Sequence, residues 1–210
     1  MKSFAPLFQR SIISLFSLAS ALLLCQCSPS IDGRSKMIVS VRDQKLLLTK
    51  DGRPVKAYKV STSKFGLGSG SGTNRTPIGK LGIAKKIGGS APKGMVFKSR
   101  RPTGEVLKPN APGRDPIVSR IMWLYGKEGH NRNTYRRCVY IHGTPEEWSL
   151  GSPASYGCIR MSSSDVVDLY NRVGVGAEVQ VIRGGLTTTT EGQRYARTVS
   201  YQLLGFSNGG

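Results

Sequence analysis

The sequence has few of the residues on which most metal and cofactor sites depend. It contains two histidines and four cysteines in 210 residues, and the histidines, His130 and His142, lie far apart. This spacing does not match a zinc site. The glycine-rich stretch 65–74 lacks the lysine and the strand-to-helix setting of a phosphate-binding loop. We therefore expect neither a metal ion nor an organic cofactor.

Acidic residues are scarce, and the chain is strongly basic. Twelve Asp and Glu residues face 31 Lys and Arg residues, which gives a formal net charge of +19. So large a positive charge indicates a polyanionic partner. The chain has no basic helix, zinc-ligand set or aromatic RNA-binding motif, so nucleic acid is not expected. Cell-envelope polymers or lipid head groups are the expected anions, and charge kept for solubility is the alternative.

Long apolar runs are missing except near the N-terminus. Lys2 and Arg10 give this end a positive charge, and the apolar stretch 11–24 follows. That stretch is too short for a membrane-spanning helix. Residues 1–27 therefore predict a signal peptide, and with it an exported protein of the periplasm or cell envelope.

The end of this segment, Leu-Cys-Gln-Cys, resembles a lipoprotein processing site. Cys27 is the expected lipid-bearing residue, and Cys25 is a second choice. Ordinary cleavage nearby is the alternative, because a small residue is expected before the cysteine. A lipid on Cys27 would tether the protein to a membrane, with residues 28–35 as a short linker.

The rest of the composition predicts one mainly β domain with a few short helices, from residue 36 to 183. Glycine is abundant, with 26 residues, and short runs of Val, Ile, Leu and Tyr alternate with turn signals. Strands are expected at 37–41, 44–49, 55–61, 80–85, 119–125, 137–141 and 177–182. An N-cap among residues 162–165 starts an amphipathic helix. Residues 88–115 are expected to form a long surface loop or insertion beside the site, and residues 184–210 a flexible polar tail.

Two short runs carry the candidate chemistry: His142-Gly143-Thr144, and Ser155-Tyr156-Gly157-Cys158-Ile159-Arg160-Met161. A cysteine nucleophile needs a thiolate, and a thiolate needs a base or a positive field. His142, at the end of an apolar run, is the candidate base. A third group orients the histidine in such pairs; the Gly143 carbonyl is the first choice and the Thr144 hydroxyl the second.

The residues around Cys158 add further predictions. Gly157 permits a tight turn that presents the thiol together with backbone N–H groups, which would form an oxyanion hole. The positive end of the following helix is expected to lower the pKa of the thiol modestly. Arg160 either binds a substrate carboxylate or braces the loop.

Two further side chains have mainly structural interpretations. Cys138 stands four residues before His142, on the same side of a regular strand, and is expected to be a small buried core residue. A disulfide between Cys138 and Cys158 is the alternative in an oxidising compartment. Trp123 is expected in the core rather than as a ligand-binding residue.

The two runs together resemble the signature of the L,D-transpeptidase catalytic domain, the YkuD-type family of bacterial cell-wall enzymes. The strand pattern at the start of the domain and the run Arg75-Thr76-Pro77-Ile78-Gly79 are also similar to the family. Many members have a histidine directly before the Gly-Cys pair, where this chain has Tyr156. The role of that histidine is either dispensable here or taken by the Tyr156 hydroxyl.

The resemblance implies a β-sandwich-like catalytic domain that acts on peptidoglycan stem peptides. Cys158 would attack the carbonyl before the terminal D-alanine, His142 would transfer the proton, and Gly143 would orient His142. The remaining motif residues, expected to contact substrate or shape the loop, are Ser155, Tyr156, Gly157, Arg160 and Thr144. An acceptor amine would then take the acyl group. The alternatives are an L,D-carboxypeptidase or stem-trimming hydrolase of the same fold, and a non-catalytic peptidoglycan-binding lipoprotein.

Overall fold

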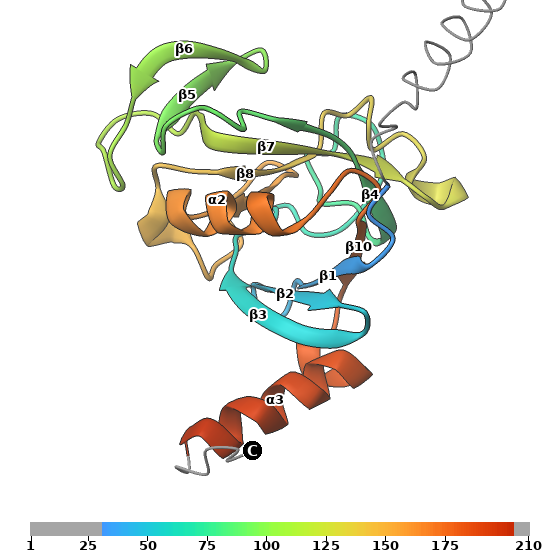
Figure 1. The fold of residues 1–210 in the computed structure, drawn as a ribbon. Helices are drawn as coiled ribbons and strands as arrows, with labels where there is room; N and C mark the ends of the chain where they lie inside the picture. Colours follow the sequence, from blue (N-terminus) through green and yellow to red (C-terminus); the bar gives the residue numbers. More distant parts are fainter. Residues whose placement is uncertain (1–30, 204–210) are drawn as a thin grey trace, which may run out of the picture. The chain divides into compact units, whose positions relative to one another are not determined.

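The computed structural model describes residues 31–203 and shows a mainly β domain (Figure 1). Within this range ten strands join in one mixed sheet, in the order β3-β2-β1-β10-β4-β7-β5-β6, and β8 pairs with both β7 and β9. The mainly β prediction is confirmed. No helix in the same range is long and apolar enough to span a membrane. The predicted signal peptide, Cys25, Cys27 and residues 28–30 of the linker lie outside the described residues.

The strands are β1 (Ser35–Ser40), β2 (Lys45–Lys50), β3 (Arg53–Lys59), β4 (Gly79–Ile87), β5 (Met95–Lys98), β6 (Arg101–Val106), β7 (Ile117–Gly126), β8 (Tyr140–Gly143), β9 (Ile159–Met161) and β10 (Glu178–Ile182). The helical segments are η1 (Gly129–Asn131), η2 (Glu147–Ser149), α2 (Ser163–Arg172), η3 (Leu186–Thr188) and α3 (Thr190–Leu203). The predicted strands each overlap an observed strand. The least accurate prediction is the strand at 137–141, because the observed strand β8 begins at residue 140 and ends at residue 143.

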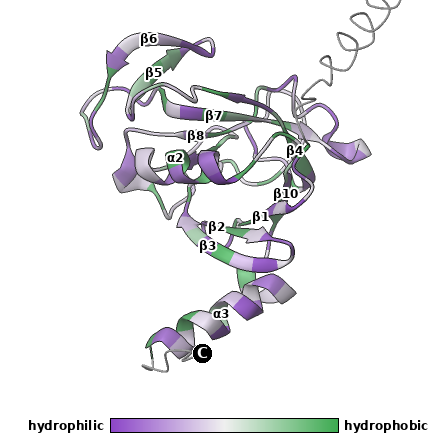
Figure 2. Ribbon diagram, viewed as in Figure 1, coloured by the Kyte–Doolittle hydropathy of each residue, from purple (hydrophilic) through white to green (hydrophobic). Residues whose placement is uncertain are grey.

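Helix α2 packs against the strands that carry the candidate site. Its N-cap is Ser162, whose side chain accepts a hydrogen bond from the Asp165 amide, as the sequence predicted. Hydrophobic and hydrophilic residues alternate along the helix (Figure 2). Val166 and Leu169 are fully buried and belong to the same core cluster as residues of β8 and β9. The apolar face of α2 therefore fixes β8 and β9 from the core side.

Residues 88–115, predicted as a long surface loop or insertion, contain the β5–β6 hairpin. Its turn residues, Ser99 and Arg100, have φ angles of 50° and 68°. Two successive positive φ angles are typical of the tight turns that match the twist of paired strands. The hairpin was not predicted because this pair lacks the Asn-Gly or Asp-Gly signal, and because every residue of β6 is exposed, which removes the apolar alternation.

The predicted polar tail is also wrong over most of its length, since residues 186–203 form η3 and α3. Leu186 and Tyr195 pack on Ile38 and Leu47, on the face of β1 and β2 opposite the main core. Lys36 and Glu191 add an ion pair, with 3.1 Å between the charged atoms. The run of four threonines at 187–190 led to the prediction of a polar tail. A few apolar contacts nevertheless dock the mostly hydrophilic helix on the sheet (Figure 2).

A charged cluster joins β3 to α2 and generates a test of the fold. Burial would raise the pKa of Asp168, but hydrogen bonds from Lys56, Arg172 and Tyr58 outweigh it and lower that pKa from 3.8 to about 2. A carboxyl group with a lowered folded-state pKa stabilises the fold at pH values above its unfolded-state pKa. This stabilisation is lost as the pH falls through the folded-state pKa. We expect Asp168→Asn to reduce the free energy of unfolding near neutral pH, and the difference from wild type to shrink toward pH of about 2.

Urea unfolding of the two proteins at several pH values measures this difference. Asp165→Asn is a suitable control, because Asp165 lies farther from Lys56, at 3.9 Å against 2.9 Å for Asp168. If the difference in free energy of unfolding between wild type and Asp168→Asn did not change with pH, Asp168 would not have the lowered pKa assigned to it.

Candidate active site

Strands β8 and β9 place the predicted catalytic side chains on one face of the sheet. The two strands run parallel, with Ile141 opposite Ile159 and His142 opposite Arg160. Side chains alternate along a strand, so burial of the two isoleucines in the main core turns His142 and Arg160 to the other face. Cys158 precedes β9 and packs with a separate apolar cluster on that second face.

A short turn from Ser155 to Cys158 presents the thiol. The Ser155 hydroxyl donates a hydrogen bond of 2.6 Å to the Cys158 carbonyl and accepts one of 3.2 Å from the Gly157 amide. Gly157 has a φ angle of 117°, and an added Cβ would lie 3.3 Å from the Arg75 carbonyl oxygen. Ser155 is only 2% exposed. Both residues therefore shape the turn, and the predicted substrate contact of Ser155 is not supported.

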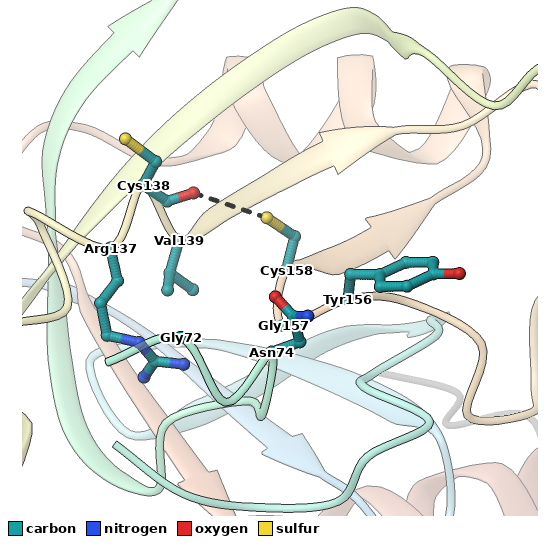
Figure 3. A pocket seen from close by; sticks show the side chains of 8 residues that line it. All are labelled: Gly72, Asn74, Arg137, Cys138, Val139, Tyr156, Gly157 and Cys158. Atoms are coloured by element: carbon teal, nitrogen blue, oxygen red, sulfur yellow. Dashed lines mark hydrogen bonds between the residues drawn. The ribbon is translucent and has the colours of Figure 1, made fainter. Parts of the chain in front are cut away.

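The Cys158 thiol opens into a cavity of about 200 Å³ (Figure 3). The cavity is lined by Gly72, Asn74, Arg137, Cys138, Val139, Tyr156, Gly157 and Cys158. Within residues 31–203 the sulfur has two hydrogen-bond partners: it donates to the Cys138 carbonyl at 3.6 Å and accepts from the Tyr140 amide at 3.4 Å. The thiol is thus held by backbone groups rather than by His142 in this resting arrangement.

His142 is 6% exposed and is oriented by its own strand. Its Nδ1 lies 2.9 Å from the Gly143 carbonyl oxygen. Because a carbonyl only accepts, this contact puts the proton on Nδ1 and leaves Nε2 as the basic nitrogen. Gly143 cannot be replaced easily, since an added Cβ would lie 2.6 Å from the Val118 carbonyl oxygen. The first-choice prediction for the orienting group therefore agrees with this geometry.

Burial keeps both members of the pair uncharged. It raises the pKa of the Cys158 thiol to about 11, although the Tyr140 amide, Arg137 and Arg160 act in the opposite direction. Burial also lowers the pKa of His142, against the effect of the Gly143 carbonyl. The net pKa of the thiol is raised, because desolvation disfavours the thiolate more than the nearby positive charges favour it. The modest lowering predicted from the helix end is not among the causes of this shift and stays a prediction.

Arg160 braces the loops around His142 rather than facing the cavity. The residue is 4% exposed, and its guanidinium forms ion pairs with Asp115 and Glu146. Thr144 is fully buried and donates a hydrogen bond to Asp115. Of the two predicted roles of Arg160, bracing is the one that these contacts support. The predictions that Thr144 orients His142 or contacts substrate are not supported, because its hydroxyl is already engaged.

Tyr156 borders the cavity, but its side chain points away from the Cys158 sulfur (Figure 3). It is 64% exposed, and its hydroxyl accepts a hydrogen bond of 2.9 Å from Lys64. The Phe65 ring lies 5.5 Å from the Tyr156 ring, measured between centroids. In this arrangement the Tyr156 hydroxyl does not take the place of a histidine beside the nucleophile. Its exposed ring remains available for contact with a bound molecule.

The structure adds Arg137 and the backbone of Cys138 to the site, which sequence reasoning missed. Cys138 has a φ angle of 55°. It therefore does not belong to a regular strand with His142, in contrast to the prediction. This conformation aims its carbonyl at the Cys158 thiol, whereas its own sulfur points elsewhere (Figure 3). Both cysteines are free, so the alternative disulfide is not present. The sequence placed Arg137 and Cys138 inside the predicted strand 137–141, whereas the observed strand β8 begins only at Tyr140.

A wall of aromatic and cationic side chains continues the same sheet face. Trp123 is opposite Tyr140 in the β7–β8 pairing and opposite Lys85 in the β4–β7 pairing. Trp123 stacks on Tyr135 with 4.1 Å between ring centroids, and the Arg100 guanidinium lies 4.8 Å from its ring. A second cavity, of about 440 Å³, lies along this wall. Trp123 is therefore only partly buried and borders a cavity, in contrast to the predicted core position.

Comparison with known proteins gives a consistent result. The family model described as "L,D-transpeptidase catalytic domain" matches residues 34–181. The probable L,D-transpeptidase YbiS of Escherichia coli (strain K12) is 39% identical over 61 residues, which are 28% of this chain and 20% of that protein. YqjB of Bacillus subtilis (strain 168) is 26% identical over 170 residues, covering 81% of this chain and 83% of that protein.

Two solved structures are also similar to part of the chain. An L,D-transpeptidase from Mycobacterium smegmatis has a TM-score of 0.47 and 19% identity, covering 71% of this chain and 58% of that chain. One from Xylanimonas cellulosilytica has a TM-score of 0.47 and 18% identity, covering 80% of this chain and 69% of that chain.

The buried thiol generates a prediction about reactivity. We expect iodoacetamide to alkylate Cys158 more slowly at neutral pH than it alkylates a free cysteine, because a pKa of about 11 leaves little thiolate. The rate at Cys158 should keep rising above pH of about 8.5, the ordinary pKa of a free thiol. Peptide mass mapping over time measures each cysteine separately. A rate at Cys158 that levels off below that pH would show that burial does not disfavour the thiolate.

Proposed function

Because this chain belongs to the L,D-transpeptidase catalytic domain family, we propose that it transfers an acyl group from peptidoglycan stem peptides through a cysteine thioester. One observation carries the proposal: the Cys158 thiol opens into a cavity on the same sheet face as His142, whose Nε2 is left as the basic nitrogen. The bond cleaved would be the one before the terminal D-alanine of the stem. The chain matches only 20% of the length of the first relative described above, so this activity rests on the site itself.

In the acylation step, the Cys158 sulfur attacks the substrate carbonyl carbon while His142 Nε2 accepts the thiol proton. The Gly143 carbonyl stabilises the imidazolium through Nδ1–H. The Cys158 amide has no hydrogen-bond acceptor among residues 31–203, so its N–H is available for the oxyanion. His142 then gives the proton to the departing amine as the C–N bond breaks, which leaves a thioester on Cys158.

In the second step, an acceptor amine attacks the thioester carbonyl and releases the Cys158 sulfur. His142 takes a proton from the amine and returns it to the thiol, so the resting state is restored. An amine on a second stem gives a cross-link, and one on another molecule attaches that molecule to the wall. If water takes the place of the amine, the same residues produce a carboxypeptidase. The chemistry needs no cofactor in either case.

We expect Cys158→Ala to abolish product formation and His142→Ala to slow acylation by about 10²–10⁴-fold, the usual contribution of a general acid–base group. His130→Ala is a matched control, because His130 is an exposed histidine that contacts the Ile78 carbonyl and lies outside the site. The assay incubates the purified protein with a tetrapeptide-stem muropeptide, with and without an amine acceptor, and follows intact-protein and product masses.

The products distinguish the candidate functions. A Cys158-dependent adduct and a dimeric muropeptide would establish transpeptidation, and a shortened stem alone would establish a carboxypeptidase. Unchanged turnover in Cys158→Ala would remove Cys158 from the mechanism. Binding to sacculi without any adduct or product would favour the non-catalytic alternative.

We also propose that the protein is exported and carries a lipid on Cys27, from the lipoprotein-like end of its N-terminal segment. Metabolic labelling with a fatty acid should then mark the wild type but not Cys27→Ala. Label retained in Cys27→Ala and lost in Cys25→Ala would move the site to Cys25. Absence of label from the wild type would instead favour simple cleavage.

A further inference from the structure

The cavity beside Cys158 contains one charged side chain, Arg137, and no carboxylate among its eight lining residues. We propose that Arg137 is a carboxylate-binding site for the terminal residue of the donor peptide, the residue that leaves during acylation. This inference rests on the proposed acyl transfer and adds a reason why the enzyme would release one residue from a free C-terminus.

The guanidinium of Arg137 is fixed without being neutralised. It donates hydrogen bonds to two backbone carbonyls, at 3.2 Å to Gly68 and 2.7 Å to Arg75. An arginine has five N–H donors, so further donors remain for a ligand. Arg137 forms no ion pair with any acidic residue in the range 31–203, whereas the charge of Arg160 is compensated by Asp115 and Glu146. Arg137 is thus a cation without an ion-pair partner among the described residues, and it is the cationic side chain in the lining of the Cys158 cavity.

Arg137 and Cys158 line the same small cavity, where a donor peptide would place the carboxylate one residue beyond the cleaved bond. Successive residues of an extended peptide are about 3.8 Å apart, so the terminal carboxylate lies close to the carbonyl that Cys158 attacks. A cavity of about 200 Å³ is smaller than the sites that hold drug-sized ligands, about 300–1,000 Å³, and suits a small leaving residue rather than a longer chain. A planar guanidinium binds a carboxylate through two parallel hydrogen bonds, which fixes the ligand's direction as well as its charge.

Arg137 also has a structural role, because its two carbonyl contacts hold residues 68 and 75 of the loop that leads into β4. A purely structural role and the proposed binding role make different predictions. Loss of the loop brace would weaken reaction with every substrate alike. Loss of a carboxylate site would weaken reaction only with substrates that carry the carboxylate.

The experiment therefore compares two donor peptides that differ only at the C-terminus, one with a free carboxylate and one with a carboxamide. We expect the wild type to prefer the free carboxylate, and Arg137→Gln to reduce the ratio of the two kcat/KM values about tenfold or more. Arg137→Lys should restore part of the preference for the free carboxylate, because lysine keeps the positive charge but cannot form the two parallel hydrogen bonds of a guanidinium. A matched control is Arg136→Gln, which makes the same change in net charge at an exposed neighbour. Equal loss with both peptides in Arg137→Gln would overturn the proposal.

A second measurement does not depend on turnover, so it separates failure of this inference from failure of the proposed function. Iodoacetate carries a carboxylate and iodoacetamide does not, but both alkylate a thiol by the same displacement of iodide. We expect the rate ratio of iodoacetate to iodoacetamide at Cys158 to fall several-fold in Arg137→Gln and to stay at the wild-type value in Arg136→Gln. A ratio unchanged in Arg137→Gln would show that the cavity has no anion site at Arg137, whether or not the protein is a transpeptidase.

Discussion

The parallel pairing of β8 with β9 is the constraint on which the site depends. Ile141 and Ile159 are fully buried on one side of this pair, and His142 and Arg160 lie opposite each other on the other side. A slip of one residue would exchange the two faces, because the side-chain period of a strand is two. The apolar core therefore fixes the position of the base, and α2 holds the pair from behind through Val166. Packing, rather than any polar contact, determines which residues meet.

Two arginines whose charges act on the Cys158 thiol illustrate how charge is divided between structure and chemistry. Arg160 lies in the strand pair and is matched by Asp115 and Glu146, so its burial is compensated. Arg137 comes from the loop before β8 and is held by carbonyl oxygens, which orient a cation without cancelling it. A fixed but uncompensated charge in a cavity attracts an anionic ligand. The contrast between them depends on tertiary contacts, although both are arginines close to the two motif runs.

The sequence predicted what local pattern controls and missed what depends on distant contacts. His142, the Gly143 carbonyl, the Gly157 turn and the N-cap of α2 are each specified by neighbours a few residues away. Helix α3 was missed because its docking depends on Ile38 and Leu47, more than 130 residues earlier in the chain. The net rise of the thiol pKa was missed for a related reason. Nearby positive charge is visible in the sequence, whereas burial is a property of the assembled fold.

Burial of the thiol and the imidazole also bears on the acceptor step of the proposed acyl transfer. A thiol with a pKa of about 11 beside a histidine of lowered pKa does not form an ion pair at rest, so proton transfer has to accompany attack on the bound carbonyl. The same neutral imidazole is a weak base toward water in the second step. An uncharged amine is more nucleophilic than water and needs less help from a base, and a desolvated cavity favours the uncharged form of an amine. In the proposed acyl transfer, the electrostatics that slow formation of the thiolate would therefore favour transfer to an amine over hydrolysis.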